Sequence, residues 1–150
     1  VWGYSWMGNL IGSVVLAYIV MASGTLDQAG EFIQSVAAKK MSMPVTALFL
    51  RGILCNWLVC LALWTASRAK SDAAKCILIF WCLFAFIACG FEHSVANMTL
   101  LSISLFMNHA ADVSWMGFGY NLLWVSLGNI VGGGFFVGFL YWFSTRKETE

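Results

Sequence analysis

Residues 76–107 read CILIFWCLFAFIACGFEHSVANMTLLSISLFM, and this stretch decides how the chain folds. Cysteine thiols aside, its only ionisable groups are Glu92 and His93, near its centre. One continuous helix of this length would measure about 48 Å, whereas the hydrocarbon core of a bilayer is about 30 Å thick. The stretch is therefore too long for a single straight membrane span, and an interruption is expected at its polar centre.

We predict that this apolar run, the third in the chain, is a broken helix. Two half-helices of about 74–89 and 98–107 would be separated by a break from Gly90 to Asn97. Irregular backbone at membrane depth persists only where it is buried in protein or lines a cavity. In transporters, polar residues at such breaks mark the substrate site.

Three side chains at the break are candidates for a substrate pathway: His93, Ser94 and Asn97. An ionisable group within a membrane segment is a functional hypothesis by default. The alternative for His93 is a neutral, hydrogen-bonded histidine in the protein core. Glu92 is expected to hold the break together, either by accepting backbone N–H groups or by pairing with a cation, and Gly90 is expected to be structural there.

The rest of the chain is also strongly apolar: 61% of its residues are hydrophobic and 10% are charged, whereas a soluble domain has about 25% charged residues. Residues 1–26 and 113–145 contain no Asp, Glu, Lys or Arg, and residues 41–67 contain only Arg51. Each stretch exceeds the roughly 20 residues needed to cross a bilayer. The sequence therefore predicts an all-α membrane protein with about four spans. Asn56, inside one of them, serves either an interhelical hydrogen bond or the pathway.

The remaining helices are expected at about 3–23, 44–67 and 116–144, where the long apolar stretches lie. Residues 25–28 fit a capping box, the Thr-x-x-Gln pattern that begins many helices. It is followed by apolar residues at helical spacing. We therefore expect an amphipathic connector at 25–38, lying at the membrane surface or at a pore mouth.

Lysine and arginine residues orient the chain. The linker at 68–75 and the tail at 145–150 both carry them, and two spans separate these segments, so both lie on one side of the membrane. The positive-inside rule makes that side cytoplasmic. Lys39 and Lys40 then lie on the opposite side, and residues that break a local rule are suspected of function.

A short internal similarity suggests a repeat. Residues 8–13 read GNLIGS and residues 128–133 read GNIVGG. Two spans lie between them, so the two helices cross in opposite directions, which is typical of an inverted repeat. Residues 3–23 would be the last helix of a first three-helix repeat and 44–144 a second, complete one. The alternative is that GxxxG recurs because it packs membrane helices.

The same repeat predicts six spans in the intact protein. The chain begins almost inside a span and without an initiator methionine, so we expect an N-terminally truncated fragment, a partial transmembrane channel domain. A net charge of +1 and the lack of a basic patch exclude a nucleic-acid partner. The five cysteines lack CxxC spacing, so neither a metal nor a cofactor is expected. A membrane redox protein with haem bound by His93 and His109 is a weaker alternative to a transport function.

GFEHSVANM at 90–98 and RGILCNWLVCLALW at 51–64 resemble the formate/nitrite transporter family, most of all its nitrite branch. The resemblance runs from about residue 3 to 144. It implies an aquaporin-like bundle of inverted three-helix repeats, assembled as a homopentamer in the bacterial inner membrane. It also implies a channel or transporter, not an enzyme.

By position, the resemblance assigns roles to residues of this chain. It implies that His93 is the pore histidine, with Asn97 beside it and Asn56 facing it from the preceding span. Lys40 matches a vestibule lysine that attracts anions, and Phe86 and Val59 match apolar constrictions. The expected substrate is nitrite, with His93 mediating proton-coupled passage. The alternatives are a formate or hydrosulfide channel, or a pore for neutral solutes such as water or ammonia.

Overall fold

The computed structural model describes residues 1–107 and 112–146. Every regular element in these two ranges is helical. Three helices are long and apolar enough to cross a membrane: Trp2–Ala22, Val45–Arg68 and the continuous helix Trp115–Thr145. The prediction of an all-helical chain with long apolar spans is confirmed, whereas the span count and the inverted repeat stay predictions.

The chain divides into two compact units, which are described separately. Unit 1 contains Val1–Pro44 and Ser94–Leu123, and unit 2 contains Val45–His93 and Trp124–Glu150. The boundary between the units falls within the apolar run, directly after His93. The predicted site residues therefore belong to two units.

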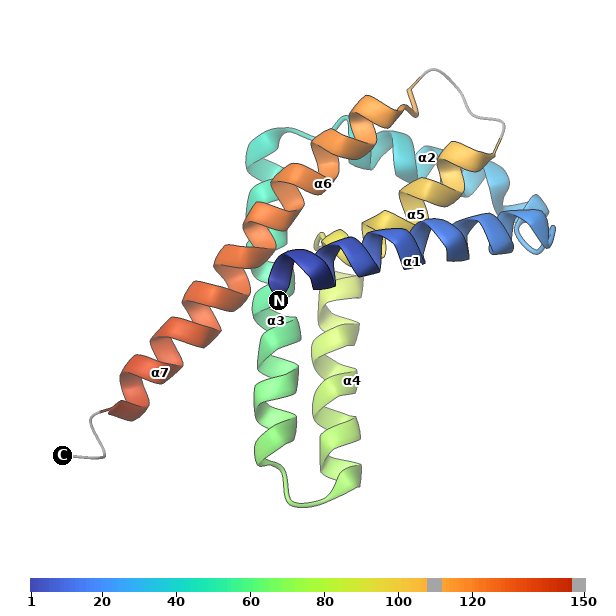
Figure 1. Cartoon of the computed structure of the whole chain (residues 1–150). Coiled ribbons are helices and arrows are strands. Elements are labelled where there is room, and N and C mark those ends of the chain that lie inside the picture. Colours follow the sequence, from blue (N-terminus) through green and yellow to red (C-terminus); the bar gives the residue numbers. More distant parts are fainter. Residues whose placement is uncertain (108–111, 147–150) are drawn as a thin grey trace. The chain divides into compact units, whose positions relative to one another are not determined.

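Unit 1 is built around α5. Both α1 and α2 pack against this helix, and Figure 1 shows α1 lying along it. The ring of Tyr18 meets the ring of Phe106 edge-on, with centroids 6.1 Å apart. The elements of unit 1 are α1 (Trp2–Ala22), the 3-10 turn η1 (Asp27–Ala29), α2 (Gly30–Met41), α5 (Ser94–Phe106) and the first part of α6 (Trp115–Ile130).

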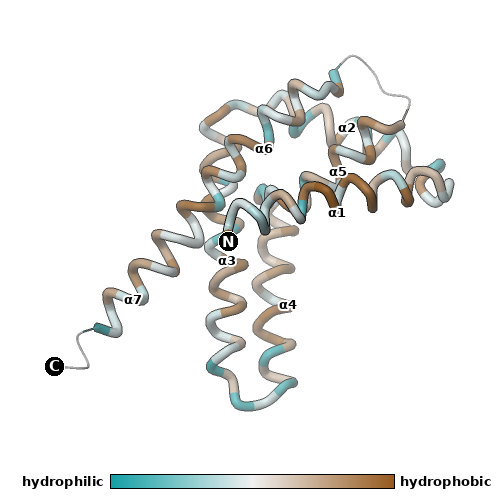
Figure 2. The backbone as a smooth tube through the Cα atoms, in the orientation of Figure 1, coloured by the Kyte–Doolittle hydropathy of each residue, from teal (hydrophilic) through white to brown (hydrophobic). Residues whose placement is uncertain are grey.

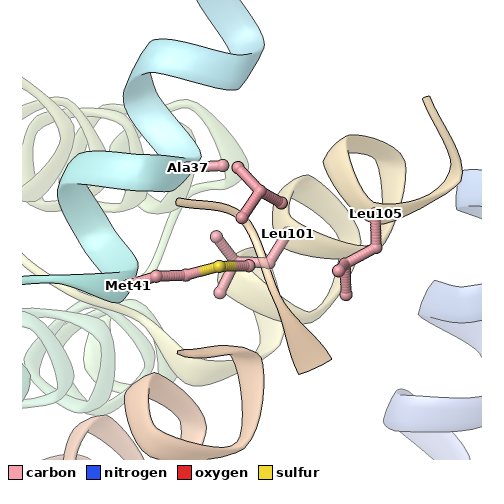
Figure 3. Close-up of a cluster of buried hydrophobic side chains, with 5 residues drawn as sticks. Ala37, Met41, Leu101 and Leu105 are labelled. Atoms are coloured by element: carbon pink, nitrogen blue, oxygen red, sulfur yellow. The ribbon is translucent and has the colours of Figure 1, made fainter. Parts of the chain in front are cut away.

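A small apolar core joins α2 to α5. Ala37 and Met41 of α2 point toward Leu101 and Leu105 of α5, and Val113 completes the cluster (Figure 3). Each pair is four residues apart, so both members lie on one face of their helix. The division of α2 into an apolar and a polar face is incomplete, because Gln34 also bonds to Ser104 of α5, while Phe32 is exposed together with Glu31 and Lys39.

Unit 2 is a helical hairpin with a long third helix packed against it. The hairpin helices are α3 (Val45–Arg68) and α4 (Asp72–Ala88), which lie side by side in Figure 1. Figure 2 shows hydrophilic residues gathered at the turn between them. Ser71 caps α4, because its side chain accepts a hydrogen bond from the Ala74 N–H at 3.2 Å. The third helix runs from Trp124 through η2 (Val131–Phe139) and α7 (Leu140–Thr145).

The expected capping box at 25–28 is wrong. The helical turn begins at Asp27, and no side chain caps it. Gly24 has a positive φ of 69° and turns the chain directly after α1. The Thr25 hydroxyl consequently lies 2.7 Å from the Ser23 hydroxyl, back along the chain.

The expected limits of the break also need correction. α4 ends at Ala88 and α5 begins at Ser94, whereas a break from Gly90 to Asn97 was predicted. Ser94 and Asn97 therefore lie in the first turn of α5. The physical reason is that Gly90 is the only glycine in this stretch, and no glycine or proline follows it to oppose helix formation. That α4 and α5 form one interrupted span stays a prediction.

The last long helix contains nine π-helical residues, Val131–Phe139, which the sequence analysis did not predict. At the end of this stretch the Leu140 N–H donates to the Phe135 carbonyl, five residues earlier. Three consecutive glycines, residues 132–134, lie within it. Wider helical turns of this kind often occur at functional sites.

Candidate functional site

The end of α4 is fixed by a local backbone motif at Gly90. Gly90 has a φ of 65°, a left-handed conformation that glycine adopts at little cost. Its N–H donates to the Ile87 carbonyl and the Phe91 N–H donates to the Phe86 carbonyl, both at 3.0 Å. This is the Schellman arrangement that commonly ends a helix. One glycine therefore stops α4 inside an otherwise apolar stretch.

The backbone of the break is held by neighbouring helices of unit 2. The Glu92 N–H donates to the Arg51 carbonyl of α3 at 3.3 Å. The Arg51 guanidinium donates back to the Gly90 carbonyl at 3.5 Å. The side-chain amide of Asn129 in α6 donates to the Glu92 carbonyl at 3.0 Å. These bonds supply partners for backbone groups that a helix would otherwise satisfy.

Asn129 is the centre of this arrangement. Its amide nitrogen also donates to the Gly52 carbonyl at 2.9 Å. Asn56 donates in turn to the Asn129 backbone carbonyl at 2.7 Å. Asn56 therefore makes an interhelical hydrogen bond through its amide nitrogen, and Asn129 connects it to the backbone at Glu92.

Close contact between α3 and the last long helix brings Asn129 into reach. A Cβ atom on Gly52 would lie 2.8 Å from the Val125 carbonyl oxygen. A Cβ on Gly128 would overlap the Phe49 carbonyl oxygen, and one on Gly132 would overlap that of Ile53. Small residues allow membrane helices to approach in this way. The close approach allowed by the glycines of GNIVGG therefore places Asn129, in the same sequence, against α3.

His93 is half-buried at the end of unit 2, with the ring of Phe86 nearby. The ring centroids are 6.1 Å apart and the planes are inclined by 33°. Asn56 and Val59 are half-buried on α3, and their three-residue spacing puts them on one face of that helix. Glu92 is almost fully buried, with 2% of its surface exposed. Unit 2 therefore contains six of the predicted residues: His93, Asn56, Phe86, Val59, Glu92 and Gly90.

Unit 1 contains the other three, Lys40, Ser94 and Asn97, and it links two of them through a fourth residue. The Asn97 amide donates to the side-chain oxygen of Asn121 at 2.8 Å. The Asn121 amide donates to the backbone carbonyl of Lys40 at 3.0 Å. Asn97 and Asn121 are both buried, and Lys40 is half-buried in the last turn of α2.

The sequence analysis missed Asn121 altogether and treated Asn129 only as part of a repeat. Both are asparagines inside an apolar helix, and a polar side chain there needs an internal partner. That signal was present but unused. No group of three or more His, Cys, Asp or Glu side chains within the described ranges is arranged to hold a metal ion. His109, the second histidine of the haem alternative, lies outside the described residues.

Long apolar helices joined by hydrogen bonds from buried asparagine side chains are typical of α-helical membrane proteins, the class that includes channels and transporters. The family described as Formate/nitrite transporter matches residues 1–143. The chain belongs to this family.

Individual relatives agree with that assignment. The chain is 50% identical to the nitrite transporter NirC of Escherichia coli (strain K12) over 148 residues. This match covers 97% of the chain and 55% of NirC, so the chain spans about half the length of that relative. A solved FNT family ion channel has a TM-score of 0.89 at 47% identity, over 95% of this chain and 57% of that one.

A second solved structure is a pentameric formate channel with formate bound. It has a TM-score of 0.87 at 32% identity and matches 97% of this chain and 65% of its own. Both structures thus resemble nearly the whole of the present chain.

Proposed function

We propose that this chain is part of a membrane channel or transporter for small monovalent weak-acid anions, with nitrite as its substrate. The observation that carries the proposal is the 50% identity to a nitrite transporter across 97% of the chain. The resemblance includes the residues around the break, where the polar side chains are concentrated.

The physical problem for such a protein is the charge of the substrate. Moving an unpaired anion into an apolar medium costs on the order of tens of kcal/mol. Hydrogen-bond donors and cationic groups lower that cost, and so does protonation of the anion. A histidine is suited to the second route, because an imidazole exchanges protons near neutral pH.

The proposed roles follow from these two routes. Lys40 raises the local anion concentration, and Ser94, Asn97 and Asn56 replace hydrogen bonds lost with water. The imidazolium of His93 transfers one proton to the anion, which crosses as the neutral acid. His93 then regains a proton from water on the side from which the anion entered.

Two further groups shape the route. Phe86 and Val59 form apolar constrictions that the neutral acid passes and the anion does not. Gly90 and Glu92 are structural and keep the break open. The contact of the Phe86 ring with the His93 ring supports a constriction beside the proton donor.

We propose the wider setting on the same basis. The chain is a partial channel domain, with 3–23 as the last helix of one repeat, 25–38 as a connector, 44–144 as an inverted second repeat and 145–150 as a cytoplasmic tail. The protein lies in the bacterial inner membrane, spans the lipid bilayer several times and forms a homopentamer. Residues 147–150 of the tail lie outside the described residues.

Flux through liposomes containing the complete protein tests the proposal. Nitrite uptake as the neutral acid should acidify the lumen in proportion to the anion moved, and His93→Asn should abolish that coupling because a side-chain amide, unlike an imidazole, does not donate a proton near neutral pH. Thr65→Val is the matched control, because the Thr65 hydroxyl bonds only within its own helix, to the Leu61 and Ala62 carbonyls. Proton-coupled nitrite passage that survives in His93→Asn would overturn the mechanism.

The same assay separates the alternative substrates. Formate or hydrosulfide passage faster than nitrite passage would assign the chain to a different anion. Passage of water or ammonia without any anion would make it a neutral-solute pore and would overturn the proposed class of substrate.

A further inference from the structure

Unit 1 contains a chain of buried hydrogen bonds that runs from α5 through α6 to α2. Its members are Asn97, Asn121 and the backbone of Lys40, with bond lengths of 2.8 and 3.0 Å. Asn121 has no exposed surface, and Asn97 is 3% exposed. Asn121 therefore connects two residues of the proposed route without being one of them.

The chemistry of the chain of bonds gives it a single direction. The Lys40 carbonyl can only accept, so the Asn121 amide must turn its nitrogen toward it. The Asn121 oxygen then faces Asn97 and accepts from the Asn97 nitrogen. If either amide were rotated by half a turn, two acceptors or two donors would face each other. The backbone of α2 thus fixes the direction of both amide groups.

The structure around Asn121 holds α6 close enough for these bonds. Gly117, one turn before Asn121, lies against Met41, and a Cβ at Gly117 would be 2.8 Å from the Met41 Cβ. The neighbouring Tyr120 hydroxyl donates to the Met43 carbonyl at 3.0 Å. Consecutive residues of α6 therefore hold the end of α2 and the segment that follows it. Carbonyls in the last turn of a helix need such partners, because the helix itself supplies none.

We propose that Asn121 is a positioning residue for the anion route. It fixes the direction of the Asn97 amide and the place of the Lys40 backbone, so that the amide and the lysine meet the anion in a constant arrangement. The proposal rests on the proposed function, since it assigns Asn121 no contact with the anion itself.

The test compares Asn97→Ala, Asn121→Ala and the double variant in liposomes containing the complete protein. For each, the fluxes of nitrite and of formate are measured. Asn121→Ala should lower nitrite flux about tenfold, the scale of one buried hydrogen bond. It should also change the nitrite-to-formate ratio in the same direction as Asn97→Ala. The double variant should be no worse than Asn97→Ala, because Asn121 acts through Asn97.

Gln34→Ala is the matched control. Gln34 also joins α2 to α5 through an amide: its nitrogen donates to the Ser104 carbonyl at 3.0 Å, and its oxygen accepts from the Ser104 hydroxyl at 2.9 Å. Its loss removes a comparable pair of bonds without touching a proposed route residue. It should leave the nitrite-to-formate ratio unchanged, because a smaller amount of folded protein lowers both fluxes equally.

The outcomes separate this inference from the proposed function. An unchanged ratio in Asn121→Ala, or additive effects of the two alanine substitutions, would overturn the positioning role while nitrite transport stands. Absence of anion flux in the unsubstituted protein would overturn both. If Asn121→Ala does not fold, Asn121→Ser is measured in its place, with the same shift in ratio expected.

Discussion

Residues 8–13 and 128–133 share a Gly-Asn start and a glycine four residues later, but their surroundings differ completely. In α6 and η2, Gly128 and Gly132 lie against the backbone of α3, and Asn129 is buried between α3 and the break. In α1, added Cβ atoms at Gly8 and Gly12 would meet nothing within 4 Å. The copy at 128–133 packs closely against α3, whereas the glycines of the copy at 8–13 are exposed.

The difference teaches that this six-residue pattern does not by itself specify its packing. Only Ser13 at the end of the α1 copy is buried, whereas the α6 copy uses its glycines and its asparagine together. The glycines allow the helix to approach α3 closely. Asn129 then donates to the Gly52 and Glu92 carbonyls. The four predictions below test this difference, each by the free energy of unfolding in detergent micelles.

Gly132→Ala should have the largest effect. The new Cβ would overlap the Ile53 carbonyl oxygen, and a backbone oxygen cannot rotate away as a flexible side chain can. We expect a loss of about 3 kcal/mol, the upper end of the usual cost of overpacking, because the contact is with rigid backbone. Gly134→Ala is the control, because nothing lies within 4 Å of a Cβ there. Equal losses for the two would show that the helix contact is not rigid.

Asn129→Ala should come next. It removes the donor to the Gly52 and Glu92 carbonyls, and buried carbonyls without a donor are costly. We expect a loss of about 2 kcal/mol. Asn9→Ala, at the matching position of the exposed copy, should change the free energy of unfolding by less than about 0.5 kcal/mol. A comparable loss at Asn9 would remove the contrast between the two copies.

Much of this arrangement follows from sequence, and the part that does not has a physical reason. The long uncharged stretches predict the apolar helices, because crossing a bilayer requires length and low charge. The polar centre of the apolar run, beginning at Gly90, predicts that a helix ends near residue 89, and α4 ends at Ala88. The break was expected to continue to Asn97 because polar residues were taken as a sign of irregular backbone. Asn97 instead bonds to Asn121 from within α5.

The network of buried amides could not be predicted in the same way. The hydrogen bonds of Asn121 and Asn129 join residues 24 to 81 positions apart in sequence, the shortest being that with Asn97 and the longest that with Lys40. Such pairing depends on how the helices pack, which composition and periodicity do not determine. Polarity inside an apolar helix was the available signal, and it identifies the residues but not their partners.

Gly133→Ser should have a smaller effect than the first two substitutions. It brings the α6 copy closer to the α1 copy, which has Ser13 at the matching position. A Cβ at Gly133 would lie 2.7 Å from both the Asn56 amide nitrogen and the Cys60 sulfur, which belong to side chains that can move. We expect a loss of about 1 kcal/mol, the lower end of overpacking costs. Gly134→Ser is the control, because nothing lies within 4 Å of a Cβ there. A loss in Gly133→Ser as large as that in Gly132→Ala would mean that the Asn56 side chain cannot move aside.

Gly12→Ala should have the opposite sign and an effect no larger than that of Gly133→Ser. Alanine favours a helix over glycine by about 1 kcal/mol, and the new methyl group meets nothing in this chain. The chain should therefore become slightly more stable. The result sharpens the comparison in either direction, because a stabilised Gly12→Ala shows an open face and a destabilised one shows a face covered by another helix. In the second case both copies would pack closely against another helix. They would differ only in that the partner of residues 128–133, which is α3, belongs to this chain.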